Sequence, residues 1–183
     1  MARVLLTGMS GTGKSSVLLK LAQRGYAVVD VDDEGWSDEH PTADGLGREQ
    51  LWREDRMAAL LAEYADRSLF VAGCASNQGR FYDRFDVVVL LSVPVEMLVE
   101  RLATRESNAF GKDPADKERI LGDLAEVEPL LRATATAEID TPTVARGRRR
   151  DRAACPALRL TVRLPRGMSC RYPDEFLRGQ ESL

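Results

Sequence analysis

One octapeptide near the start of the sequence has the residue types and spacing of a phosphate-binding loop. Residues 8–15 fit the pattern G-x-x-x-x-G-K-S. Glycines in this pattern let successive backbone N–H groups turn inward around phosphate oxygens, and the following helix points the positive end of its dipole at them. We expect Lys14 to reach the β- and γ-phosphates of ATP and Ser15 to bind Mg²⁺. The expected ATP-binding residues are Gly8, Met9, Ser10, Gly11, Thr12, Gly13, Lys14, Ser15 and Ser16.

Two carboxylates stand at the end of the next apolar segment. Residues 26–31 read Tyr-Ala-Val-Val-Asp-Val, so Asp30 and Asp32 come at the end of an expected strand. A carboxylate that faces ATP phosphates is useful when Mg²⁺ lies between them or when it accepts a hydroxyl proton. Acids at strand ends are also common turn residues, and this alternative stays open.

Apolar and amphipathic segments alternate over the first 132 residues. Strands are expected over 3–7, 26–31, 68–74 and 86–92, and helices over 14–24, around 57–64, about 94–106 and about 115–132. Continuous apolar runs suit strands that are covered on both faces, and each parallel crossover must return over the sheet. We predict a three-layer α/β P-loop NTPase fold, with a mainly parallel five-stranded sheet and helices on both faces.

Two local features qualify this scheme. Residues 33–48 contain Gly35, Pro41, Gly45 and Gly47 among many acids, so we expect a mobile segment there. Pro129 lies inside the last expected helix and is predicted to kink or shorten it.

The octapeptide followed by Val29-Asp30-Val31-Asp32 resembles the shikimate kinase and gluconate kinase branch of P-loop proteins, and more loosely the nucleoside monophosphate kinases. The resemblance spans roughly residues 1–140. It implies that Asp30 helps to hold Mg²⁺ and that Asp32 contacts substrate hydroxyls and acts in catalysis.

Residues 100–105, followed by the polar segment 106–113, resemble the junction between helix and lid in these kinases. The resemblance implies that Arg101 and Arg105 clamp nucleotide phosphates or stack on adenine, and Arg105 stands where the lid should begin. Phosphoryl transfer is mostly positioning and charge neutralisation, so a mobile basic lid around 106–113 suits it. The alternative for Arg101 is an ordinary solvated helix face.

The loop after the third expected strand occupies the place where related kinases have substrate-binding glycines or basic residues. Loops at the carboxyl edge of a parallel sheet are where open α/β folds bind ligands. Asn77, Gln78 and Arg80 are therefore the predicted substrate-binding residues. A surface loop in which Arg80 is merely solvated is an equally open alternative.

Segments 69–74 with 77–82, and 127–132 with 138–141, look like a family of small actinobacterial P-loop proteins. These are labelled AAA-family ATPases or nucleotide kinases without a defined substrate. Their relatives continue with an amphipathic closing helix, whereas residues 141–183 here contain ten arginines, no lysine and four of the eight prolines. We therefore predict a kinase-like domain over 1–140 and an atypical Arg/Pro-rich tail over 141–183.

Two explanations of the tail stay open. Translation of an altered reading frame in GC-rich DNA would give this composition, and an arginine cluster also attracts nucleic acid. Few aromatic residues are interleaved, so nucleic acid is not the expected partner. Residues 158–164 alternate as an exposed edge strand would.

Other P-loop classes fit the sequence less well. It contains no Asn-Lys-x-Asp for guanine, and the third expected strand ends Val71-Ala72-Gly73-Cys74 rather than in the acids of mechanical ATPases. We predict a kinase that transfers the γ-phosphoryl group of ATP to a small hydroxyl- or phosphate-bearing acceptor, with Lys14, Asp32, Arg101 and Arg105 as catalytic residues. The alternative is an ATP-binding regulatory or partner-binding protein with weak ATPase activity.

Composition sets the remaining expectations. No apolar run approaches the ~20 residues of a membrane span, and the three cysteines, Cys74, Cys155 and Cys170, lack metal-ligand spacing. We expect a cytoplasmic protein that is a monomer or homodimer, depends on ATP and Mg²⁺, acts on a small molecule and has no membrane partner.

Overall fold

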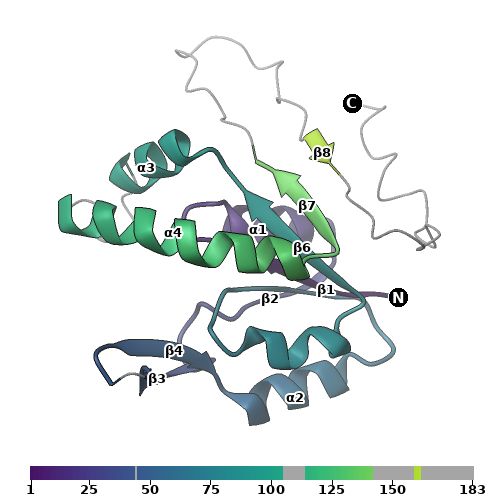
Figure 1. Ribbon diagram of the computed structural model, residues 1–183. Coiled ribbons are helices and arrows are strands. Elements are labelled where there is room, and N and C mark those ends of the chain that lie inside the picture. The colour runs from purple at the N-terminus through teal and green to yellow at the C-terminus, as the bar shows by residue number, and fades with distance from the viewer. Residues whose placement is uncertain (44, 105–113, 142–158, 162–183) are drawn as a thin grey trace.

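A six-stranded sheet with helices on both faces forms the body of the molecule (Figure 1). The computed structural model describes residues 1–43, 45–104, 114–141 and 159–161. The strand order is β2-β5-β1-β6-β7-β8. These strands are β1 (Arg3–Thr7), β2 (Ala27–Asp30), β5 (Leu69–Ala72), β6 (Val87–Ser92), β7 (Ala137–Asp140) and β8 (Arg159–Thr161).

The first five strands of this order run parallel, which confirms the predicted fold. β1 lies in the centre and pairs in parallel with β5 and β6, while β2 and β7 pair in parallel with β5 and β6 respectively. The carboxyl ends of these strands therefore meet at one edge of the sheet. That edge is where open α/β folds bind ligands.

Alternating side chains of the central strands form two cores, one on each face of the sheet. Leu5 packs on one face with Met57 of α2 (Glu54–Glu63) and Phe81 of the short 3₁₀ helix η1 (Gln78–Arg84). Leu6, the next residue of β1, packs on the other face with Leu18 of α1 (Lys14–Gln23). This arrangement explains why the strands read as continuous apolar runs.

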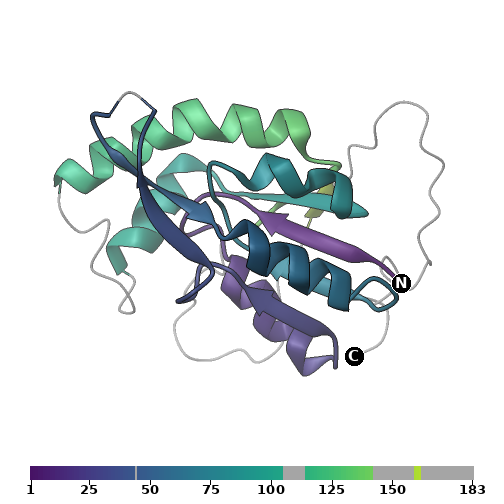
Figure 2. The same ribbon diagram turned by 90° about the horizontal axis from the view of Figure 1, so that it is seen from below.

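A small antiparallel hairpin of β3 (Ser37–Pro41) and β4 (Arg48–Trp52) follows β2. Figure 2 shows it at the end of the sheet toward which the parallel strands point. The sequence predicts only a mobile segment over 33–48, and it misses these strands. β3 reads Ser-Asp-Glu-His-Pro, without the apolar alternation that identifies a strand.

Asn77 joins the hairpin to the sheet. Its side-chain Oδ1 accepts a hydrogen bond from the Trp52 backbone N–H at 2.9 Å, and its Nδ2 donates to the Trp52 carbonyl at 2.9 Å. Both side chains are buried, with 8% of Asn77 and 2% of Trp52 exposed. The amide thus takes the place of a neighbouring strand for one residue of β4.

α3 (Val95–Thr104) and α4 (Pro114–Thr134) pack against each other beyond β6. Leu98 and Leu124 lie in their shared core, and Met9 of the phosphate loop packs on it. Pro129 lies inside α4, which continues to Thr134, so of the two effects predicted for this proline, a kink or a shorter helix, the shortening was wrong.

β8 adds a sixth strand, antiparallel to β7. The alternation over 158–164 therefore correctly predicts an edge strand for residues 159–161. The predicted lid, 106–113, and the rest of the predicted tail beyond residue 141 lie outside the described residues. Within the described ranges, no helix has both the length and the apolar character that a bilayer span requires.

Replacing Asn77 by Ala should lower the free energy of unfolding by about 1–3 kcal/mol, because it leaves buried backbone groups of Trp52 without partners. Urea unfolding followed by circular dichroism measures this. The matched control is Gln50→Ala, at an exposed position of β4, the strand that contains Trp52. If Asn77→Ala lowers the free energy of unfolding by no more than the ~0.5 kcal/mol of ordinary surface substitutions, Asn77 does not stabilise the attachment of the hairpin to the sheet.

Candidate active site

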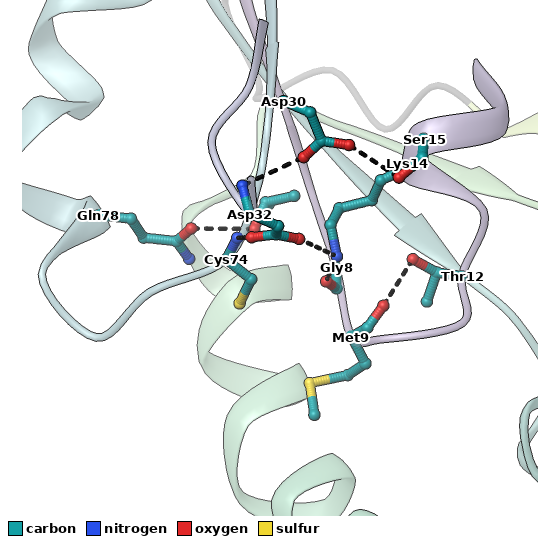
Figure 3. A network of polar contacts seen from close by, with 10 residues as sticks. Gly8, Met9, Thr12, Lys14, Ser15, Asp30, Asp32, Cys74 and Gln78 are labelled. Atoms are coloured by element: carbon teal, nitrogen blue, oxygen red, sulfur yellow. Dashed lines mark hydrogen bonds and ion pairs between the residues drawn. The ribbon is translucent and has the colours of Figure 1, made fainter. Parts of the chain in front are cut away.

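The ends of β1, β2 and β5 bring the predicted phosphate loop, both aspartates and Cys74 into one cluster (Figure 3). The loop leaves β1 at Thr7 and enters α1 at Lys14. Asp30 ends β2, and Cys74 follows β5 by two residues. The parallel topology alone therefore places these chemically different groups side by side.

The loop backbone has the shape that its glycines predict. Gly8, Gly11 and Gly13 have φ angles of 144°, 90° and 100°, a region that residues with a Cβ rarely adopt. A Cβ on Gly8 would also lie 2.4 Å from the Leu91 carbonyl oxygen. The Thr12 hydroxyl closes the loop by donating to the Met9 carbonyl at 2.9 Å.

Lys14 lies inside the loop, with only 7% of its surface exposed. Its Nζ donates to the Gly8 carbonyl at 2.9 Å and lies 3.3 Å from Asp32 Oδ2. Figure 3 shows the ammonium group between these two oxygens. A buried ammonium requires such partners, since desolvation without them costs several kcal/mol.

Ser15 and Asp30 lie together beside the lysine. The Ser15 hydroxyl donates to Asp30 Oδ2 at 2.8 Å, and Asp30 Oδ1 accepts the Asp32 backbone N–H at 3.2 Å. Two side chains with oxygen ligands next to a phosphate loop fit Mg²⁺, which is commonly bound by one or two protein oxygens together with substrate phosphates and water. Within the described part of the chain, no group of three or more His, Cys, Asp or Glu side chains is arranged so that it could hold a metal ion.

Cys74 is a site residue that the sequence does not single out. Its backbone N–H donates to Asp32 Oδ1 at 3.2 Å, which orients that carboxylate. Burial raises the pKa of the Cys74 thiol above its ordinary value, although the nearby Lys14 ammonium acts in the opposite direction. The thiol is therefore a poor nucleophile at neutral pH.

Each of the three predicted substrate residues has a different partner in the structure. Gln78 is buried and accepts a hydrogen bond from the Thr7 hydroxyl at 3.0 Å, whereas Asn77 is engaged with Trp52. Arg80 forms an ion pair with Glu54 on α2. Asn77 and Arg80 do line a common pocket of about 380 Å³. Their substrate contacts stay predictions.

Arg101 contacts the phosphate loop from α3. Its Nη1 donates to the Gly11 carbonyl at 3.3 Å, and its Nη2 donates to the Thr141 carbonyl at 3.0 Å. The Thr141 hydroxyl in turn lies 2.9 Å from the Thr12 carbonyl. Arg101 therefore contacts carbonyl groups of the loop and of Thr141, and its predicted contact with a nucleotide stays a prediction. Arg105 lies outside the described residues.

Residues 4–122, which include the loop and both aspartates, match the family described as AAA domain. The chain belongs to the AAA domain family. The phosphate loop of an AAA domain implies that it binds a nucleotide. No curated protein matches the chain.

This AAA domain is similar to solved kinase structures. The shikimate kinase from Acinetobacter baumannii in complex with shikimate has a TM-score of 0.51 and 22% identity, over 78% of this chain and 85% of that one. The shikimate kinase from Bacteroides thetaiotaomicron has a TM-score of 0.50 and 18% identity, over 76% and 86%. A gluconokinase from Sinorhizobium meliloti 1021 has a TM-score of 0.45 and 22% identity, over 76% and 82%. At these identities the two shikimate kinase structures establish the fold alone, and they confirm the predicted resemblance at that level.

Alkylation of Cys74 should report the charges around the phosphate loop. Iodoacetamide should label Cys74 more slowly than a cysteine in the unfolded chain, because the thiolate is the reactive form and burial raises the pKa of Cys74. An ordinary cysteine thiol has a pKa of about 8.5. Lys14→Ala removes a cation that lowers the thiol pKa, so the inflection of the pH–rate profile should move higher. Asp32→Asn removes a carboxylate that raises the thiol pKa, so the inflection should move lower.

Mass spectrometry of the peptide that contains Cys74 measures these rates without interference from the other cysteines. Lys20→Ala, at an exposed position of α1, should leave the profile unchanged. Shifts of the same sign for Lys14→Ala and Asp32→Asn would contradict this electrostatic description.

Proposed function

We propose that this AAA domain is a kinase that binds MgATP in the loop of residues 8–15 and phosphorylates a small acceptor that carries a hydroxyl group. The observation that carries this proposal is the contact between the buried Lys14 ammonium and Asp32. It links the phosphate-binding group directly to a carboxylate that can accept a proton. A phosphate loop without such a carboxylate would support only nucleotide binding.

Lys14 and the loop N–H groups neutralise the charge that develops on the γ-phosphoryl group and on the leaving ADP. Ser15 and Asp30 are the residues that would hold Mg²⁺, which would supply positive charge against the phosphates. The acceptor oxygen attacks the γ-phosphorus as the bond to the β-phosphate oxygen breaks. The hydroxyl proton passes to Asp32, and ADP leaves.

Asp32 is available for this step once ATP is bound. In the structure its Oδ2 pairs with Lys14, while Oδ1 is held by the Cys74 N–H. Incoming phosphates compete for the ammonium and release Oδ2, and the Cys74 contact keeps the carboxylate at the edge of the loop. Its side chain is 46% exposed, so an acceptor hydroxyl can reach it.

Arg101 acts in this scheme mainly on the loop itself. Its contacts with Gly11 and Thr141 hold the carbonyl side of the loop, which keeps the opposite N–H groups directed at the phosphates. Arg105 is proposed to clamp the γ-phosphate from the lid, following the resemblance to shikimate kinases.

One observation favours a second candidate function, a nucleotide-dependent regulatory protein with weak ATPase activity. β5 is followed by Gly73 and Cys74, where mechanical ATPases place the acid that activates water. In the absence of an acceptor, only slow hydrolysis is then expected. This candidate and the kinase differ in whether an acceptor accelerates ADP release.

Three variants test the kinase proposal. Lys14→Ala should abolish ATP binding, because it removes the cation that pairs with the β- and γ-phosphates. Asp32→Asn should bind ATP at least as tightly, since it frees Lys14, but acceptor-dependent turnover should fall by roughly 10²–10⁴-fold. The matched control is Lys20→Ala on the exposed face of α1, which should resemble the unmodified protein.

Calorimetry measures ATP binding, and a coupled assay measures ADP release with a panel of sugars, polyols, cyclitols and nucleoside monophosphates. Nucleotide binding without any acceleration by these acceptors would favour the regulatory function. Unchanged turnover in Asp32→Asn would remove the proposed base.

A further inference from the structure

A pocket lies between β4 of the hairpin and the segment 76–80 that follows β5. It has a volume of about 380 Å³ and is lined by Glu49 and Leu51 of β4 and by Ser76, Asn77, Gly79 and Arg80. Ser76 lies two residues beyond Cys74, whose N–H holds Asp32. A Cβ on Gly73 would lie 3.1 Å from both Asp32 Oδ1 and Trp52 Cζ2, so the β4 residue that follows Leu51 is close to the proposed proton acceptor.

The arginines around this pocket are already neutralised. Arg80 is paired with Glu54, and Arg48 lies 2.6 Å from Glu39. Arg53 lies 3.8 Å from Asp38 and 3.7 Å from Asp55. A carboxylate or phosphate on the acceptor would have to displace one of these acids, so the pocket disfavours an anionic acceptor.

Glu49 differs from the acids of the preceding ion pairs, because no arginine pairs with it among the described residues. It is half-buried and lies on the same face of β4 as Leu51. Within the described ranges its carboxylate has no ion pair, although His40 stands opposite it on β3. A partly desolvated carboxylate is stabilised by a cation more than by a neutral group, because the local dielectric is below that of water.

We propose that the acceptor carries a primary ammonium group that pairs with Glu49 while a hydroxyl group of the same molecule reaches Asp32. This inference rests on the proposed kinase function. It assigns the acceptor to the amino sugars or amino polyols. Glu49 then determines specificity, and the pair of Arg80 with Glu54 excludes the corresponding acids.

Matched acceptors that differ in one group test this assignment. The probes are glucosamine, glucose and gluconate, and on a three-carbon scaffold 2-amino-1,3-propanediol, glycerol and glycerate. We expect kcat/KM to be highest for the amine of at least one set. Glu49→Gln should reduce kcat/KM for that amine by roughly 10–100-fold, the range of a charged hydrogen bond, and change it little for the neutral polyol.

The control is Glu63→Gln, a surface acid of α2 that pairs with Arg67 and should leave this preference intact. Glu54→Gln supplies the opposite test, because it frees the Arg80 guanidinium to bind an anion. We expect this variant to raise the relative kcat/KM for gluconate or glycerate.

Calorimetric titration of the same probes separates this inference from the kinase proposal. Binding of an amine that depends on Glu49, without turnover of any probe, would support the amine site and count against the kinase. Turnover that prefers the neutral or acidic probes, or amine use that is unchanged in Glu49→Gln, would overturn the amine site while leaving the kinase intact. Failure of every amine to bind or react would also overturn it.

Discussion

The position of one ammonium group controls the geometry of the candidate site. Lys14 is buried between the Gly8 carbonyl and Asp32, so the charge at the centre of the loop is satisfied before any ligand arrives. This pair restrains the carboxylate that follows β2, which is itself held by Cys74 beyond β5. Three strand ends thus depend on a single cation, and a nucleotide that engages the cation must change its relation to all three.

The loop is also supported from the side that faces away from the phosphates. Arg101 and Gly11 are 90 residues apart in the sequence, and Thr141 and Thr12 are 129 residues apart. Together they connect α3 and the end of β7 to loop carbonyls. Because a loop with three glycines has little conformational preference of its own, such contacts from distant segments determine whether its N–H groups are aligned in advance.

The sequence was sufficient to predict the features that depend on residues close to one another in the chain. The glycine and lysine spacing identified the phosphate loop, and apolar runs identified the parallel strands that place Asp30 beside Ser15. It could not reveal Cys74 or Thr141, since their roles depend on which strand ends become neighbours in the folded sheet. It also missed β3, because that strand is formed by backbone pairing with β4 rather than by an apolar face.

Asn77 shows a second reason why the sequence alone does not reveal what a residue near the site contacts. A polar residue in a loop at the carboxyl edge of a sheet is a reasonable ligand-binding candidate, yet its amide is used on the Trp52 backbone. One structural consequence follows for specificity. By fixing β4, Asn77 fixes where Glu49 and Leu51 stand relative to Arg80, and so it shapes the pocket. The two sides of the site then differ in charge: the phosphate loop holds the buried Lys14 ammonium, whereas the arginines beside the pocket are paired with acids and Glu49 has no ion pair within the described residues. Under the kinase proposal, this difference would favour the ATP phosphates at the loop and disfavour them at the pocket.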